Sequence, residues 1–164
     1  VGDEAVVEPS GKSRRLGLDV GLRWEFLKNF YFQADYTYSN ARMTEEPSGA
    51  DYIPLAPVNT LLAGLTYKTD RFSAGAHCRW LGNRPANEDY SLTAKGYCIT
   101  DINASYTIGK LTFGAAVENL FDVKWREAQF ATETMIPGDD APVTDICFTP
   151  GTPFALRGFV SYRF

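Results

Sequence analysis

The sequence predicts an all-β fold, an antiparallel transmembrane β-barrel, from three observations. Apolar and polar residues alternate with a period of two through about seven segments, each near the length of a tilted membrane strand. The connections between these segments alternate between short turns and long polar loops. Aromatic residues, which make up 14% of the chain, gather at the ends of the apolar faces. Outer-membrane barrels combine these features, whereas a soluble barrel or sandwich buries its apolar face and gains nothing by grouping aromatics by height.

Composition excludes several other classes. The 164 residues carry a net charge of −4 without a basic run, so a nucleic-acid partner is not expected. Mean hydropathy is −0.22, and the longest apolar runs are far too short for a membrane-spanning helix. A membrane barrel is compatible with such a low value, because only alternate residues meet lipid. Since Val1 is not a methionine, the chain is expected to be a processed protein or a piece of a longer one.

The first two full strands form a predicted hairpin. Residues 1–8 are expected to end an earlier strand, and a turn-rich segment follows. The next strands are expected over 16–26 and 30–39, with a turn at Lys28-Asn29 between them. Each has one apolar face and one face with charged or small polar residues, which is the pattern of a half-buried strand.

The remaining strands repeat this pattern. They are expected over 59–68, 72–80, 97–108, 111–118 and 154–164. Tight turns at Thr69-Asp70 and Gly109-Lys110 lie on one side of the sheet, and three long loops lie on the other. The loops are expected over 43–56, 82–95 and 119–153.

Aromatics on the apolar face form two predicted girdles. Those near the short turns are Trp24, Phe26, Phe30, Phe32, Tyr67, Phe72, Tyr106, Phe113, Tyr162 and Phe164; those near the long loops are Tyr36, Tyr38, Trp80 and Phe154. Aromatic rings favour the two interfaces of a membrane. The last strand ends on Phe164, which would promote aggregation in water but suits a membrane interface. Val160, Tyr162 and Phe164 are therefore expected to serve barrel assembly.

Several segments resemble TonB-dependent outer-membrane receptors. Val117-Glu-Asn-Leu-Phe-Asp122 resembles the "ENLFD" segment near the end of these receptors, so the family motif comprises Glu118, Asn119, Leu120, Phe121 and Asp122. The segments Pro9-Ser-Gly-Lys-Ser-Arg-Arg15, Tyr52-Ile-Pro-Leu-Ala-Pro57, Pro150-Gly-Thr-Pro153 and Tyr162-Arg-Phe164 are also similar, and all occur in the family's order. Phe154 departs from the arginine that often follows Pro-Gly-Thr-Pro, and the family does not call for the three cysteines.

The resemblance implies a barrel of about 22 strands whose lumen is closed by an N-terminal plug. Family members import scarce nutrients, commonly ferric siderophores, with energy delivered by the TonB complex. On this basis residues 1–164 would be the C-terminal part of the barrel domain, with about seven strands and part of an eighth. The implied partners are membrane lipid, a small-molecule ligand at loops 43–56, 82–95 and 119–153, and TonB through an N-terminal part that this chain lacks.

The alternative is a self-contained small outer-membrane barrel of about eight strands with a structural or adhesion role. The number of predicted strands is nearly right for such a barrel. The strand tail expected at 1–8 favours the larger parent.

The polar face supplies the candidate lumen-facing residues: Arg23, Glu25, Asp35, His77, Arg79, Asp101, Asn103, Glu118 and Arg157. They could contact the plug or a passing substrate, or they could form cross-strand ion pairs that keep the wall of the lumen satisfied. The sequence favours the second interpretation.

No catalytic, metal or cofactor site is predicted. His77 is the only histidine, and no pair of carboxylates lies beside it at the spacing of metal ligands. Because no Ser-His-Asp set or phosphate-binding loop occurs either, an enzyme is not expected.

Asn119 and Asp122 are expected to cap a turn, with Leu120 and Phe121 packed against it. The cysteines leave three arrangements open. Cys98 could pair with Cys147 across the mouth of the barrel, Cys78 could pair with Cys98 across neighbouring strands, or no bridge forms.

Overall fold

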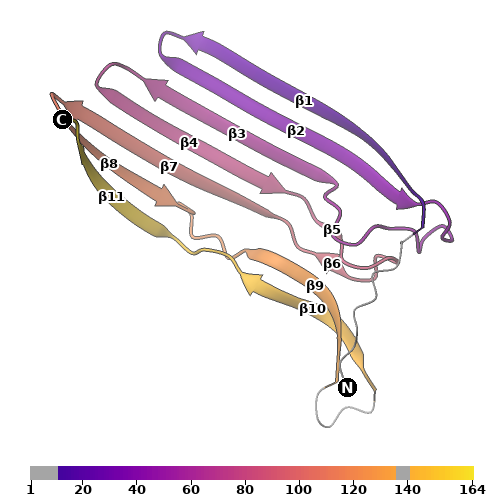
Figure 1. The fold of residues 1–164 in the computed structure, drawn as a ribbon. Helices are drawn as coiled ribbons and strands as arrows, with labels where there is room; N and C mark the ends of the chain where they lie inside the picture. Colours follow the sequence, from indigo (N-terminus) through magenta and orange to yellow (C-terminus); the bar gives the residue numbers. More distant parts are fainter. Residues whose placement is uncertain (1–10, 136–140) are drawn as a thin grey trace.

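The computed structural model describes residues 11–135 and 141–164, and it contains only β-strands and connections in these ranges. Seven strands form one antiparallel sheet in the order β1-β2-β3-β4-β7-β8-β11 (Figure 1). Their bounds are Ser13–Leu27 (β1), Phe30–Met43 (β2), Asn59–Lys68 (β3), Phe72–Leu81 (β4), Tyr97–Ile108 (β7), Leu111–Glu118 (β8) and Ala155–Tyr162 (β11). The seven predicted strands and the all-β class are confirmed. The strand tail expected at 1–8 lies outside the described residues.

Short turns join the strands at one end of the sheet. Asn29 has a φ of 71° and Gly109 a φ of 58°, left-handed conformations that asparagine and glycine adopt at little cost. In the turn between β3 and β4, the Thr69 hydroxyl accepts the Phe72 N–H at 3.0 Å. These residues let the chain reverse within two or three residues, so the register of each hairpin is fixed by its turn.

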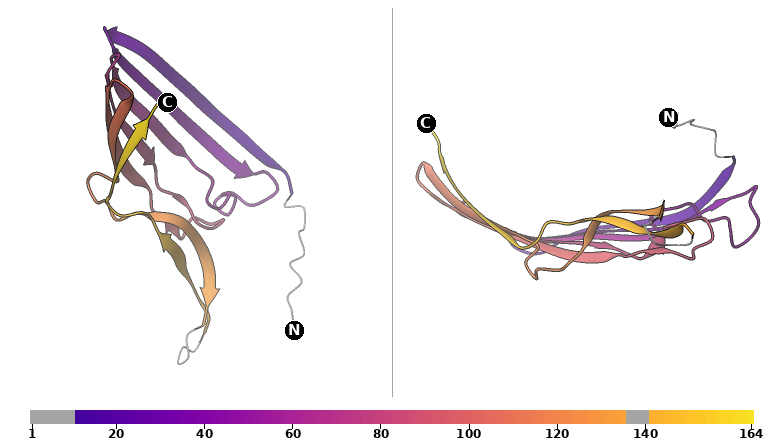
Figure 2. Two further views of the ribbon diagram at one scale, coloured as in Figure 1. Left: turned by 60° about the vertical axis from the view of Figure 1, so that its left-hand side comes forward. Right: turned by 90° about the horizontal axis from the view of Figure 1, so that it is seen from below.

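The register places the two predicted faces on opposite sides of the sheet. Leu22 lies opposite Ala34, and Ala34 lies opposite Ala63, all on the apolar face. On the polar face, His77 lies opposite Asp101. The sheet is a single curved layer that remains open, with β1 and β11 at its edges (Figure 2).

A row of aromatic rings follows the short-turn end of the apolar face. Ring centroids are 5.7 Å apart for Phe26 and Phe30, 4.6 Å for Phe30 and Tyr67, and 6.1 Å for Tyr67 and Phe72. These distances lie within the range of favourable ring pairs. The row therefore crosses the four strands β1 to β4 at the height expected for a girdle.

The connections at the other end contain structure that the sequence did not predict. Within 82–95, β5 (Arg84–Pro85) pairs with β6 (Thr93–Ala94). The long loop expected over 119–153 contains an antiparallel hairpin of its own, β9 (Arg126–Thr134) and β10 (Val143–Pro150). β10 is rich in residues that favour strands, and pairing satisfies the backbone groups of both segments. This hairpin projects beyond the end of the large sheet (Figure 2).

Most of the buried residues lie at the loop end. Pro85, Ala86, Ala94 and Ile99 are the buried apolar side chains of the described chain. In the middle of the sheet only Gly64 is buried, because the sheet is one layer thick. No helix in the described ranges is long and apolar enough to cross a membrane.

Candidate functional site

Six of the nine candidate polar-face residues meet in three cross-strand ion pairs. Arg23 Nη2 lies 2.8 Å from Asp35 Oδ2, Arg79 Nη2 lies 3.3 Å from Asp101 Oδ2, and Arg157 Nη2 lies 2.9 Å from Glu118 Oε1. Within the described ranges, Glu25, His77 and Asn103 form no ion pair.

The three pairs share one geometry. In each, the carboxylate lies directly opposite the residue two positions before the arginine, so the side chains meet along a diagonal of the sheet. All six side chains are at least partly exposed in the open sheet, where such a pair contributes about 0–1 kcal/mol. Their arrangement therefore neutralises the polar face more than it stabilises the fold.

Glycines make room for the large side chains of this face. Gly64 lies directly opposite His77, and a Cβ at Gly64 would lie 2.9 Å from the His77 Nδ1 atom. The Phe159 ring occupies the equivalent space above Gly114, its direct partner in β8. The polar face is thus closely packed where a histidine or a phenylalanine crosses it.

The segment 118–122 forms the turn in which β8 ends. Asn119 is 2% exposed and has a φ of 50°. Its Nδ2 donates to the carbonyls of Val123 at 2.9 Å and Thr152 at 3.0 Å, while its Oδ1 accepts the Val123 N–H at 2.9 Å. Asp122 Oδ1 accepts the Phe154 N–H at 3.0 Å. The two polar side chains therefore join the end of β8 to the start of β11.

One apolar residue of this turn, Phe121, differs from the expectation, whereas Leu120 is partly buried. Phe121 is 69% exposed, so it does not pack the turn down within the described structure. Asp122 caps the returning strand rather than its own turn, although the Asp122 N–H does donate to the Asn119 carbonyl at 2.9 Å.

One buried glutamine attaches the β9–β10 hairpin to the large sheet. Gln129 is 1% exposed, and its Oε1 accepts the Lys95 N–H at 2.9 Å. Its Nε2 donates to the Lys95 carbonyl at 2.8 Å. The side-chain amide thus pairs with the Lys95 backbone as a neighbouring strand would, and each polar atom of the Gln129 side chain has a hydrogen-bond partner. Sequence analysis missed Gln129, because a glutamine in a polar segment gives no signal of burial.

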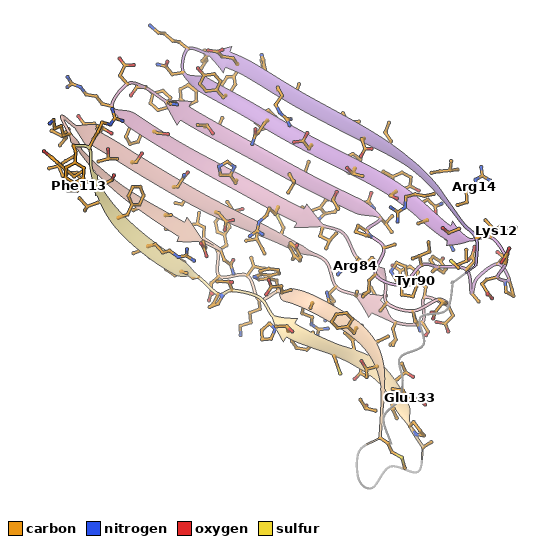
Figure 3. All side chains as sticks on the ribbon, viewed as in Figure 1. Lys12, Arg14, Arg84, Tyr90, Phe113 and Glu133 are labelled. Carbon is orange, nitrogen blue, oxygen red and sulfur yellow. The ribbon has the colours of Figure 1, made fainter. Side chains whose placement is uncertain are left out.

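Arg84 is a buried cation at the same end. It is 8% exposed, and its Nη1 has no hydrogen-bond partner among the described residues. Burial lowers the pKa of Arg84, and the Tyr97 side chain partly offsets that effect. Figure 3 shows Arg84 and Tyr90 near the long loops, at the end of the sheet opposite Phe113. A buried guanidinium in this state is a favourable place for an anion.

The loop 43–58 is held to β2 by a second cluster. Arg42 Nη1 lies 2.8 Å from Asp51 Oδ1, and its guanidinium carbon lies 3.5 Å from the centre of the Tyr52 ring. Tyr52 also packs against Tyr90, with ring centroids 5.1 Å apart. Loops 43–56 and 82–95 therefore touch through aromatic rings.

A cavity of about 640 Å³ lies between the β9–β10 hairpin and the start of β7. Its lining includes three cationic residues, Lys95, Lys124 and Arg126, and one acidic residue, Asp122. Trp125 and Phe148 add aromatic surface, and the Arg126 guanidinium stacks 4.0 Å from the centre of the Phe148 ring. The cavity therefore combines positive charge with stacking surfaces. It joins two of the loops that the sequence singled out.

The remaining predicted residues lie at the other end or on the apolar face. Val160 and Tyr162 are exposed on the edge strand β11, and Phe164 packs against Tyr162 with a centroid distance of 5.3 Å.

The three cysteines are free thiols. Cys98 contacts Cys78, with 3.4 Å between the Sγ atoms, while Cys147 lies in β10. The two cysteines in contact are those of the second arrangement, without a bond between their sulfur atoms. No cluster of three or more metal-ligating side chains occurs in the part of the chain that the structure describes.

An antiparallel sheet with one apolar and one polar face, aromatic rows and long loops at one end is the wall of an outer-membrane barrel. The family model for the β-barrel of TonB-dependent receptor-like proteins matches residues 3–120. The chain belongs to this family of outer-membrane transport receptors.

Solved structures share the fold. The siderophore receptor PiuA from Acinetobacter baumannii superposes with a TM-score of 0.69 at 17% identity, over 93% of this chain and 22% of that one. The ferric-catecholate import receptor Fiu from E. coli K12 gives 0.71 at 21% identity, over 99% and 23%. The copper transporter OprC gives 0.68 at 23% identity, over 93% and 24%. The chain thus spans about a quarter of these proteins or less. No curated protein sequence matches it.

Proposed function

We propose that this chain takes part in TonB-dependent uptake of a scarce nutrient across the bacterial outer membrane, most directly a ferric siderophore or similar chelate. The family supports the class of transport. The observation that supports the ligand is the cavity beside the β9–β10 hairpin, where Lys95, Lys124 and Arg126 converge with two aromatic rings. A chelate with anionic oxygen donors and planar rings complements such a surface through charge-assisted bonds and stacking.

In this proposal the long loops capture the chelate and the polar face lines part of its route. Loops 43–56, 82–95 and 119–153 meet the ligand, and the buried Arg84 adds positive charge nearby. Energy reaches the receptor through TonB, which contacts an N-terminal part outside this chain. The three ion pairs keep the wall polar without leaving uncompensated charge that would hold an ion in transit.

The proposal is tested by uptake of ⁵⁵Fe in a strain that lacks the gene for this protein. Iron-starved cells receive ferric catecholate, hydroxamate and citrate complexes one at a time, and a strain without TonB gives the background. The wild-type gene should restore uptake of at least one anionic chelate. Equal TonB-dependent uptake of every chelate with and without the gene would overturn the proposal.

Cavity variants test the ligand chemistry. Lys95, Lys124 and Arg126 changed together to Gln should weaken chelate binding at least tenfold, because three charge-assisted contacts are lost. Lys28→Gln, in the short turn between β1 and β2 at the other end of the sheet, is the control and should bind normally.

A further inference from the structure

We propose that Cys78 and Cys98 are a modification site of this protein and become joined by a disulfide during export. The two thiols lie on adjacent strands, Cys78 in β4 and Cys98 in β7, with 3.4 Å between their Sγ atoms. This proposal is independent of the transported ligand.

The register explains why the sulfurs meet. Cys78 lies opposite Thr100 and Cys98 lies opposite Trp80, so the two cysteines are diagonal neighbours on one face. β4 and β7 are inner strands, since β3 and β8 flank them. Neighbouring strands on both sides hold the pair in place, and adding strands at the edges of the sheet would not separate it.

The site remains reachable by an oxidant. Cys98 is exposed and Cys78 is partly exposed, and both lie beside Trp80 at the loop end of the apolar face. Aromatic side chains of this kind mark the membrane interface, where water and polar reagents are present. Cys147 lies in β10, whose partner strand is β9, and is not part of the contact.

The reaction is a thiol–disulfide exchange with a dithiol oxidase of the periplasm, in its disulfide form. The Cys98 thiolate attacks one sulfur of the oxidase, forms a mixed disulfide and releases one oxidase thiolate. The Cys78 thiolate then attacks Cys98 Sγ and displaces the second oxidase thiolate. Two cysteine thiols are oxidised, one oxidase disulfide is reduced to two thiols, and the two protons pass to the oxidase thiolates.

The bond would fasten the base of one ligand-facing loop. It closes a ring that contains the whole connection 82–96, with β5, β6 and Arg84. Covalent closure removes open conformations of this connection. The disulfide would thus hold the β5–β6 segment against the sheet while the other loops move.

The test is mass spectrometry of the native polypeptide from outer membranes prepared without reductant. Free thiols are blocked with N-ethylmaleimide before denaturation, and the protein is digested. The expected result is a peptide pair joined through Cys78 and Cys98, together with Cys147 carrying N-ethylmaleimide. Labelled Cys78 and Cys98, or a peptide pair joining Cys98 to Cys147, would overturn the proposal.

Two variants separate the pairing from loss of folding. Cys147→Ser should retain the joined peptides, whereas Cys78→Ser should leave Cys98 open to the label. Oxidised glutathione added to the reduced wild-type protein should restore the joined peptides. Failure of this step in a protein that still runs as a folded band would also count against the proposal.

Discussion

Asp101 Oδ1 accepts the backbone N–H of Asn119 at 2.8 Å, while Asp101 Oδ2 lies 3.3 Å from Arg79 Nη2. One carboxylate on the polar face therefore links an ion pair between β4 and β7 to the turn that ends β8. Since Asn119 also binds the Thr152 carbonyl, a continuous set of polar contacts runs from Arg79 to the start of β11. The family motif acts here as a junction between strands and loops.

Replacing Asn119 should weaken this junction strongly. Asn119→Ala removes three hydrogen bonds at a buried site and places alanine at a φ of 50°. We expect a loss of about 2–4 kcal/mol in the free energy of unfolding. Urea unfolding of the purified receptor in detergent, followed by tryptophan fluorescence, measures it.

Asn119→Gly is the matched control for the backbone, because glycine accepts the positive φ but not the hydrogen bonds. Its cost should be smaller than that of alanine. Phe121→Ser should cost little, since that ring is exposed. Equal stability of Asn119→Ala and wild type would show that the junction does not depend on the side chain.

Gln129 should control the attachment of the β9–β10 hairpin. Gln129→Ala removes both bonds between the buried Gln129 side chain and the backbone of Lys95, at a cost of about 1–3 kcal/mol. The effect should be local, with faster hydrogen exchange in 126–134 and 143–150 and little change in β1–β4. If hydrogen exchange in 126–134 and 143–150 were equally fast in the variant and the wild type, this role would be contradicted.

Sequence alone predicted the large sheet well, for a physical reason. Strands such as β2 and β7 have apolar residues on one face and polar residues on the other, so each carries the period of two in its own sequence. Turns were readable because Asn29 and Gly109 supply positive φ values. The hairpin β9–β10 escaped prediction because it stands away from the large sheet, and its residues show no clean alternation.

The site was predictable only in part. The charged residues of the polar face were identified because they interrupt an apolar period, and three ion pairs then follow from the register. Arg84 and Gln129 gave no such signal, since their burial arises from contacts between loops that are distant in sequence. Register also brought Cys78 to Cys98, a contact that spacing along the chain did not single out.

Acid should release the loop 43–58 before it disturbs the sheet. Desolvation raises the pKa of Asp51, but hydrogen bonds from the Gly49 N–H and the Arg42 guanidinium outweigh it and hold the pKa below its ordinary value of 3.8. A carboxyl with a depressed pKa adds stability above its unfolded-state pKa, and that stability is lost as the pH falls through the folded-state pKa. Proteolysis of the loop should therefore stay constant down to about pH 4 and rise below it.

Asp51→Asn should remove this acid response while leaving the loop more open at neutral pH. Pepsin detects cleavage within 43–58 at acid pH, and chymotrypsin, which can cleave after Tyr52, detects it at neutral pH. If cleavage of the loop in Asp51→Asn still rose below about pH 4, the acid response would come from other carboxyl groups.

The contact between Gly114 and Phe159 should appear as strong coupling in a double-mutant cycle. A Cβ at position 114 would collide with the Phe159 ring, so Gly114→Ala must displace the ring or separate β8 from β11, at about 1–3 kcal/mol. Phe159→Ala alone loses the ring's packing over the glycine. The double variant has no such collision. Its loss of unfolding free energy should therefore be well below the sum of the losses in the two single variants. Unfolding midpoints of the four proteins in detergent give the coupling energy. Gly158→Ala is the control, because a Cβ at position 158 would contact only the Gly114 carbonyl oxygen, at 3.9 Å. Additive costs would mean that Phe159 points away from Gly114 in the assembled barrel.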